Sequence, residues 1–88
     1  MVYLLDVDGT ICAPNSDVLF EGVADEVNRI YSQGHHVWLF TCRPSNPIWV
    51  DALVKQGLRF DGIIQKPFAE DGYVLIDDKL IDARKKLL

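Results

Sequence analysis

Apolar residues gather in four short runs, at residues 2–7 (VYLLDV), 37–40 (VWLF), 63–64 (II) and 73–76 (YVLI). Each run is rich in β-branched or aromatic residues and is too short for a globular helix, which indicates strands. The apolar positions within a run are continuous rather than alternating. Because continuous apolarity is typical of strands buried on both faces, the runs predict a parallel sheet.

Helical spacing occurs between these predicted strands. In residues 23–31 the apolar side chains fall on one helical face, and Gly34 follows as a C-terminal stop. Pro47 is a favourable first-turn residue for a second helix that runs to Gly57. A third helix is predicted over residues 79–87, where lysines in the last turn complement the helix dipole.

The order of the elements predicts the architecture. A β-α-β-α-β-β-α order indicates an α/β fold, a three-layer sandwich with a small, mainly parallel sheet, formed by a single domain over residues 1–88. Asp-Gly turn signals precede the third and fourth strands. The connection over residues 65–72 is too short for a full helix, so this crossover must be abbreviated.

Composition narrows the class of protein. The 88 residues carry a formal net charge of −4 and a pI of about 4.9, which argues against a general affinity for the nucleic-acid backbone. The two cysteines have no CxxC spacing and fit a reducing compartment. There is no signal-peptide pattern, and no apolar run approaches the ~20 residues that span a bilayer. We therefore expect a soluble, cytoplasmic protein with no membrane partner.

Each apolar run is followed by polar residues of types used in catalysis. Because ligands bind at the carboxyl ends of parallel strands in open α/β sheets, we expect all of these groups at one edge. Clustered carboxylates would be electrostatically costly without a cation between them. In strand order, the residues are Asp6 and Asp8, then Thr41 and Arg43, then Lys66, then Asp77 and Asp78.

The chemistry of this set suits phosphoryl transfer. Oxygen ligands suit Mg²⁺, which binds one or two carboxylates and keeps several waters. An Asp carboxylate can attack phosphorus, and a second carboxylate two residues on can protonate the leaving group and then activate water. A Lys ammonium stabilises the phosphoryl oxygens, and a Thr hydroxyl donates a hydrogen bond to them.

The same residues resemble the four motifs of the haloacid dehalogenase (HAD) superfamily. Residues 6–10 (DVDGT) after an apolar strand resemble its first motif, and Thr41 at a strand end resembles its second. Lys66 resembles the lysine of the third motif, and Asp77-Asp78 after YVLI resembles the acidic pair of the fourth. All four occur in the family's order and cover nearly the whole chain.

The resemblance implies a role for each matched position. Asp6 would be the nucleophile and a metal ligand. Asp8 would be the general acid/base, and its backbone carbonyl would ligate Mg²⁺. Thr41 and Lys66 would hold the phosphoryl group, with Gly9 among the substrate-binding residues. An acid two residues after the nucleophile is typical of the family's phosphatases rather than of its dehalogenases.

The resemblance also implies that the acidic pair completes the metal site and that no cap domain is present. Asp77 would reach Mg²⁺ directly or through water, and Asp78 would be a water-mediated partner. Family members usually carry a cap, but residues 11–22 and the ten residues between Lys66 and Asp77 leave no room for one. The chain thus resembles the cap-less subgroup, whose members often oligomerise to cover the site, so a homo-oligomer is a possible assembly.

Other polar and aromatic residues near the predicted site have competing interpretations. Arg43 is assigned to substrate binding, through a second anionic group, or to pairing with a local acid. Trp49 is predicted to pack in the core with the second helix rather than to contact a substrate. Phe20 would shield the site or pack against the first helix, and Lys79 would balance the charge of the acidic pair.

The cysteines and histidines are not assigned to catalysis. Cys12 and Cys42 are predicted to be buried small hydrophobes. His35 and His36 precede the second strand, which places them at the edge opposite the carboxylates.

The sequence leaves more than one function open. The leading prediction is an HAD-type phosphatase, a Mg²⁺-dependent phosphomonoester hydrolase that acts on a small phosphorylated metabolite such as a sugar phosphate. A polynucleotide end phosphatase is the alternative enzyme, because an open site admits a large substrate. A non-catalytic module that binds phosphate or Mg²⁺ is the alternative outside catalysis, although Asp6 and Asp8 are both present. Transfer of the phosphoryl group to an acceptor other than water is not separated from hydrolysis.

Overall fold

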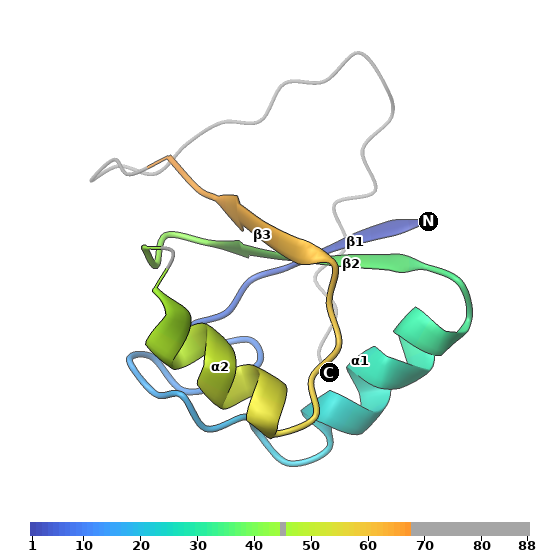
Figure 1. Ribbon diagram of the computed structural model, residues 1–88, viewed down its shortest axis with the longest axis horizontal. Coiled ribbons are helices and arrows are strands. Elements are labelled where there is room, and N and C mark those ends of the chain that lie inside the picture. Colours follow the sequence, from blue (N-terminus) through green and yellow to red (C-terminus); the bar gives the residue numbers. More distant parts are fainter. Residues whose placement is uncertain (45, 68–88) are drawn as a thin grey trace.

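The described part of the chain is built on three parallel strands. A computed structural model describes residues 1–44 and 46–67. Along the chain the elements are β1 (Val2–Leu5), α1 (Val23–Ser32), β2 (His36–Thr41), α2 (Pro47–Lys55) and β3 (Gly62–Gln65), shown in Figure 1. The strand order is β1-β2-β3, and both neighbouring pairs are parallel. The predicted α/β class and parallel sheet are therefore confirmed over these elements.

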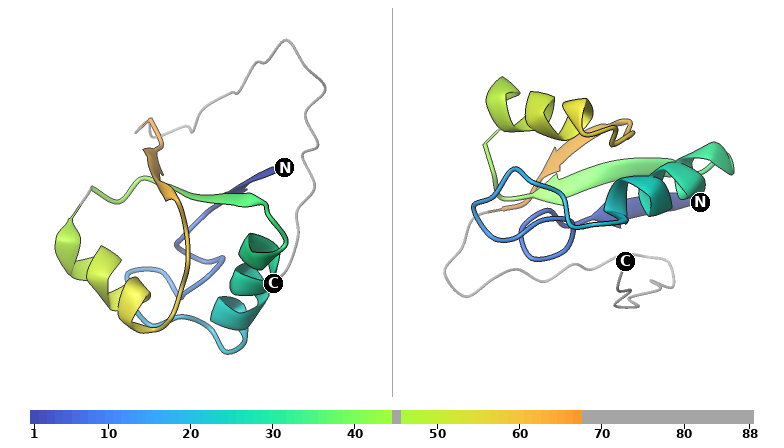
Figure 2. Two further views of the ribbon diagram at one scale, coloured as in Figure 1. Left: turned by 45° about the vertical axis from the view of Figure 1, so that its right-hand side comes forward. Right: turned by 90° about the horizontal axis from the view of Figure 1, so that it is seen from below.

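Both helices lie on the same side of the sheet (Figures 1 and 2). Each helix connects two adjacent strands, and the strand order β1-β2-β3 runs in one direction across the sheet. Because β-α-β crossovers are right-handed, both helices then lie on the same face of the sheet. Alternate residues of β2 that face the helices are buried, among them Val37 and Leu39. They form the core together with residues of the two helices, namely Val23, Val27, Ile30, Trp49 and Leu53.

The opposite face of the sheet carries exposed apolar side chains. Val2 is 58% exposed, Leu4 48% and Ile64 41%. On this face Trp38 lies against Gly62, where an added Cβ would come within 2.5 Å of the indole ring. The described residues thus form two layers rather than the expected three. The predicted fourth strand and third helix lie outside the described residues.

The helix boundaries follow the capping signals of the sequence. α1 ends at Ser32, and Gly34 has φ 88°, a left-handed conformation that costs glycine little. The Asn46 side chain accepts a hydrogen bond from the N–H of Ile48 at 2.9 Å, and Pro47 occupies the first turn of α2. These residues determine where α1 ends and where α2 begins. Neither helix in the described ranges has the length and apolarity needed to cross a membrane.

The histidine pair lies at the amino end of β2, away from the strand ends that precede the helices, as predicted. His36 Nδ1 is 3.5 Å from Asp61 Oδ2, and His35 Nδ1 is 3.2 Å from the amino group of Met1. Asp61 also accepts a hydrogen bond from the N–H of Val37 at 2.8 Å. The Asp61 contacts join the chain before β3 to the start of β2, and the His35 contact joins β2 to the N-terminus. The candidate site lies at the opposite edge of the sheet.

Candidate functional site

Three predicted site residues lie at the carboxyl ends of neighbouring strands. Asp6 directly follows β1, Thr41 is the last residue of β2, and Lys66 directly follows β3. The pairing continues past β3, because the N–H of Lys66 donates to the carbonyl of Thr41 at 2.8 Å. The parallel register therefore brings Asp6 and Lys66, 60 positions apart in the chain, to one edge of the sheet.

Asp6 and Lys66 form an ion pair at this edge. Lys66 Nζ donates to Asp6 Oδ1 at 2.8 Å, and the N–H of Val7 donates to the same oxygen at 3.0 Å. Asp6 Oδ2 accepts a long hydrogen bond of 3.5 Å from the Thr10 hydroxyl. The Lys66 side chain is 16% exposed, with Nζ 5.1 Å from the centroid of the Phe40 ring, whereas the Asp6 side chain is 45% exposed. Asp6 Oδ2 is thus the less engaged oxygen of an accessible carboxylate.

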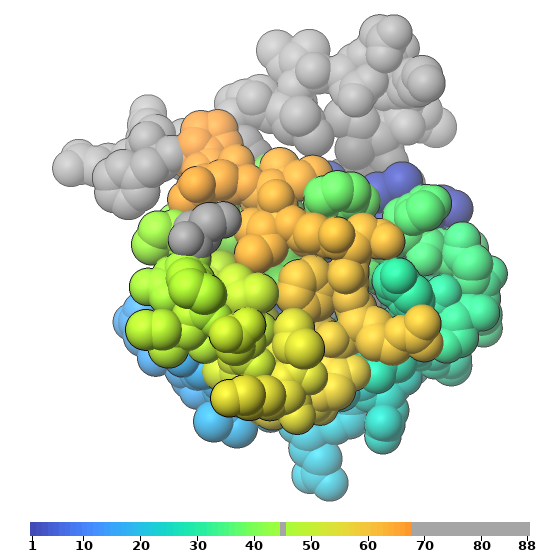
Figure 3. Space-filling view, in the orientation of Figure 1, coloured from blue at the N-terminus to red at the C-terminus, as the bar shows by residue number. Residues whose placement is uncertain are grey.

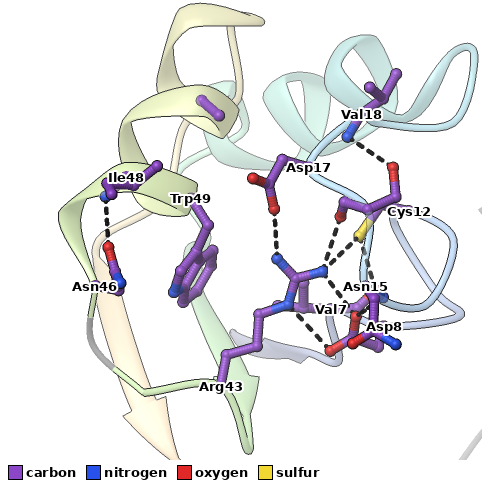
Figure 4. Close-up of polar contacts among 12 residues, drawn as sticks. Val7, Asp8, Cys12, Asn15, Asp17, Val18, Arg43, Asn46, Ile48 and Trp49 are labelled. Carbon is purple, nitrogen blue, oxygen red and sulfur yellow. Dashed lines mark hydrogen bonds and ion pairs between the residues drawn. The ribbon is translucent and has the colours of Figure 1, made fainter.

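Asp8 forms a different kind of ion pair, in which Arg43 contacts both carboxylate oxygens (Figure 4). Arg43 Nε donates to Asp8 Oδ2 at 3.1 Å, and Nη2 donates to Oδ1 at 2.7 Å. The N–H of Asn15 donates to Oδ1 at 3.0 Å. The Arg43 hydrogen bonds lower the pKa of Asp8, although burial opposes this, and they raise the pKa of Arg43. Arg43 therefore favours the carboxylate form of Asp8.

The Arg43 guanidinium has further partners. Nη1 donates to Asp17 Oδ1 at 2.8 Å, and Nη2 donates to the carbonyl of Ser16 at 2.8 Å. The guanidinium lies over the Trp49 ring at 5.2 Å from its centroid, and the Arg43 side chain is 13% exposed (Figure 4). Of the two interpretations of Arg43, the structure shows the pairing with local acids. Contact with an anionic group of a substrate stays a prediction.

Arg43 and Gln56 hold the loop of residues 12–19, which we call the 12–19 loop. An antiparallel bridge joins its two ends. Gln56, at the end of α2, accepts a hydrogen bond from the N–H of Leu19 at 2.9 Å and donates one to the carbonyl of Asp17. Figure 3 shows this loop, in blue, beside α2, in yellow-green. The loop is thus attached to the turn after β2 by Arg43 and to α2 by Gln56.

Thr41 and Gly9 use their polar groups within the protein. Thr41 is 1% exposed, and its Oγ1 accepts a hydrogen bond from the N–H of Arg43 at 3.0 Å. Gly9 has φ 81°, and its N–H donates to the carbonyl of Cys12 at 2.8 Å. Thr41 therefore shapes the turn that presents Arg43, and Gly9 shapes the turn after Asp8. Their contacts with a phosphorylated substrate stay predictions.

The oxygen donors at Asp6 are of the type that Mg²⁺ binds. Within residues 1–44 and 46–67, no group of three or more His, Cys, Asp or Glu side chains is placed to hold a metal. Mg²⁺ needs only one or two carboxylates in addition to its waters, and the accessible carboxylate of Asp6 supplies one. Because Arg43 occupies the Asp8 carboxylate, the Asp8 carbonyl is the ligand compatible with the resemblance. Asp77 and Asp78, the other expected ligands, lie outside the described residues.

Asp17 and Gln56 belong to the site region but were not predicted from the sequence. Asp17 contacts Arg43, which is 26 positions away, and Gln56 reaches the 12–19 loop from 37 and 39 positions away. Asp17 lies in a loop, and Gln56 is a single amide at the end of a helix. Neither residue belongs to a spacing pattern that would have marked it.

The predictions for buried residues near the site are confirmed in two cases and wrong in one. Trp49 packs in the core, and its Nε1 donates to the carbonyl of Pro44 at 2.8 Å. Cys12 is buried, and burial raises the pKa of its thiol. Cys42 is exposed instead of buried, because it lies in the turn after β2 rather than in the strand. Phe20, for which shielding of the site and packing against the first helix were the alternatives, is 46% exposed.

Comparison of this chain with protein-family models, with curated proteins and with solved structures found no match. The α/β architecture and the contacts of the described residues are therefore the observations from which a function is proposed.

Proposed function

We propose that the protein is a Mg²⁺-dependent phosphomonoester hydrolase that acts through an aspartyl-phosphate on Asp6. The observation that carries this proposal is the contact of 2.8 Å between Lys66 Nζ and Asp6 Oδ1 at the carboxyl edge of a parallel sheet. A carboxylate beside a cation is suited to bind an anionic phosphoryl group and attack it. The order of motifs that resembles the HAD superfamily supports the same reaction and the same fold family.

Asp6 supplies the nucleophile in this proposal. Lys66 and the N–H of Val7 both donate to Oδ1, so we assign the attack to Oδ2. Attack forms a bond between Oδ2 and phosphorus, and the bond from phosphorus to the ester oxygen breaks. Lys66 stabilises the negative charge of the phosphoryl oxygens, and its low exposure of 16% strengthens that interaction.

Asp8 exchanges the protons. Its carboxyl group donates a proton to the departing ester oxygen, which leaves as an alcohol. The Asp8 carboxylate then takes a proton from a water that attacks phosphorus, inorganic phosphate departs, and Asp6 is restored. Because the Arg43 hydrogen bonds lower the pKa of Asp8, they make its protonated form a stronger acid for the first step and favour the carboxylate that the second step requires.

Asp6 and the backbone carbonyl of Asp8 would hold Mg²⁺, together with the acids of the C-terminal segment that the resemblance implies. When bound, the ion would offset the negative charges of the nucleophile and the phosphoryl group.

A small phosphorylated metabolite, such as a sugar phosphate, is the proposed substrate. The chain has a net charge of −4, which opposes the binding of a polyanion, whereas a single phosphate requires only a local cation such as Lys66. A polynucleotide with a terminal phosphate is the alternative substrate.

The test is phosphate release from a panel of sugar phosphates, nucleotides and end-phosphorylated oligonucleotides, with Mg²⁺ and with chelator. The variants are Asp6→Asn and, as a matched control, Asp25→Asn, an exposed acid in the first turn of α1. We expect Mg²⁺-dependent release that Asp6→Asn abolishes and Asp25→Asn retains.

Other outcomes choose between the remaining functions. Release only from oligonucleotide ends would favour the polynucleotide phosphatase. Folded protein that binds Mg²⁺ but releases no phosphate from any ester would contradict the proposal and favour a binding module.

A further inference from the structure

Every nitrogen of the Arg43 guanidinium donates a hydrogen bond within the described structure. Nε and Nη2 donate to the two oxygens of Asp8, Nη1 donates to Asp17, and Nη2 also donates to the carbonyl of Ser16. A planar fork that contacts both oxygens of a carboxylate fixes the plane of that carboxylate as well as its position. Asp8 therefore has one orientation as long as Arg43 is in place.

Arg43 is itself held from three directions. Its N–H donates to Thr41 Oγ1 at 3.0 Å, and its carbonyl accepts a hydrogen bond from Gln65 Nε2 at 3.0 Å. The Trp49 ring lies against the guanidinium (Figure 4). Trp49 is anchored in turn by the hydrogen bond from its Nε1 to the carbonyl of Pro44. Elements β2, β3 and α2 thus all contribute to the placement of this one side chain.

The two oxygens of Asp8 are engaged unequally. Oδ1 accepts hydrogen bonds from Arg43 Nη2 and from the N–H of Asn15, whereas Oδ2 accepts one from Arg43 Nε. The hydrogen bond to Oδ1 is also the shorter of the two from Arg43, at 2.7 Å against 3.1 Å. Oδ2 is therefore the oxygen better able to exchange a proton with another group.

We propose that Arg43 is a positioning residue that orients Asp8 so that Oδ2 exchanges the proton with the ester oxygen and with water. This inference rests on the proposed phosphatase function. It assigns Arg43 an action through Asp8, in place of direct contact with the substrate. Asp17 is the second anchor of Arg43, so the 12–19 loop contributes to the orientation of Asp8.

The test compares two esters that differ in their need for a proton. The alkoxide that leaves an alkyl ester such as glycerol phosphate must be protonated, whereas the nitrophenolate of p-nitrophenyl phosphate leaves without a proton. The rate of phosphoenzyme formation is measured in single turnovers of the full chain with Mg²⁺, for the wild type and for Arg43→Gln. We expect Arg43→Gln to slow the alkyl ester by roughly 10²-fold and the aryl ester far less, because general acid catalysis contributes on the order of 10²- to 10⁴-fold.

Additional variants separate positioning from loss of structure. Asp17→Asn removes the charge of the second anchor of Arg43 but leaves the fork to Asp8, so we expect a smaller effect than that of Arg43→Gln, again larger for the alkyl ester. In an Asp8→Asn background, Arg43→Gln should cause no further loss, because the residue through which it acts is already changed. Arg43→Lys keeps the charge between Asp8 and Asp17 without the fork, and it replaces Arg43→Gln if circular dichroism shows that the Gln variant does not fold.

Three results would overturn the inference. An equal loss with both esters would make Arg43 a purely structural residue. A rise in KM with unchanged kcat would assign Arg43 to substrate binding, and additive losses in the double variant would show that it acts independently of Asp8. A wild-type protein inactive with both esters would instead overturn the proposed function, and with it this inference.

Discussion

The two ion pairs at the carboxyl edge of the sheet are built in different ways. Lys66 contacts one oxygen of Asp6 at 2.8 Å, and the Asp6 side chain stays 45% exposed. Arg43, whose side chain is 13% exposed, contacts both oxygens of Asp8, whose side chain is 36% exposed. A Lys ammonium is a point charge on a flexible stem, whereas an Arg fork imposes a plane. One carboxylate thus keeps an oxygen outside its ion pair, and the other is fixed in orientation through both oxygens, as the nucleophile and the proton carrier that we propose would each require.

The largest expected effect comes from removing the Asp6 carboxylate. We expect Asp6→Asn to lower Mg²⁺-dependent phosphate release by at least roughly 10³-fold, because an amide cannot form the aspartyl-phosphate. Release by the purified variant is measured against Asp25→Asn, which changes an exposed acid in the first turn of α1. Release that survives the Asp6 change would mean that the nucleophile lies elsewhere.

The second largest effect is expected from removing the cation of the Asp6–Lys66 ion pair. Lys66→Gln should lower kcat by about 10²-fold, because a charge that stabilises the phosphoryl oxygens is lost. Lys55→Gln is the matched control, since Lys55 is an exposed lysine in the last turn of α2. Equal effects of the two substitutions on steady-state kinetics would show that Lys66 acts only through the overall charge of the protein.

The Asp8–Arg43 ion pair should make the free energy of unfolding depend on pH. Arg43 lowers the pKa of Asp8 below its ordinary value of 3.8, so the stabilisation is fully present above that value and is lost as the pH falls through the lower folded-state pKa. We expect the free energy of unfolding of the wild type to fall more steeply with acidification below about pH 4 than that of Asp8→Asn. Urea unfolding across a pH series measures both slopes, and parallel curves would contradict the Asp8–Arg43 pairing in solution.

The attachment of the 12–19 loop gives the smallest expected effect. Gln56→Ala removes the hydrogen bonds from α2 to Leu19 and Asp17, and we expect a loss of about 1 kcal/mol in the free energy of unfolding. Hydrogen exchange at the Leu19 amide should become faster. Gln33→Ala, an exposed glutamine after α1, is the control, and unchanged exchange at Leu19 in the Gln56 variant would show that the loop is held by Arg43 alone.

The order and type of the described elements follow from the pattern along the chain. Apolar runs between capping and turn residues predicted three strands and two helices, because burial and backbone hydrogen bonding select local structure with those periods. The boundaries were less well determined. The first strand was expected to reach residue 7 but β1 ends at Leu5, since the N–H of Val7 donates to the Asp6 side chain instead of to a neighbouring strand.

The sequence by itself also determined which polar residues meet at the sheet edge. Asp6 and Lys66 follow strands that pair in parallel with the same neighbour, and parallel pairing aligns carboxyl ends regardless of the distance along the chain. Their proximity was therefore predictable once the strands had been recognised. The predicted acids after the fourth strand lie outside the described residues.

Only the tertiary structure decided what the neighbouring polar groups do. A side chain at the end of a strand points to one face of the sheet or the other according to register, and a shift of one residue reverses the face. The motifs therefore did not predict that Thr41 is buried on the side of the helices while Asp6 is accessible. From the sequence, Arg43 was predicted either to bind an anionic group of the substrate or to pair with a local acid. Its choice depended on the fold of the 12–19 loop, which places Asp17 and Ser16 beside Asp8 and surrounds the guanidinium with partners that no local pattern in the chain specifies.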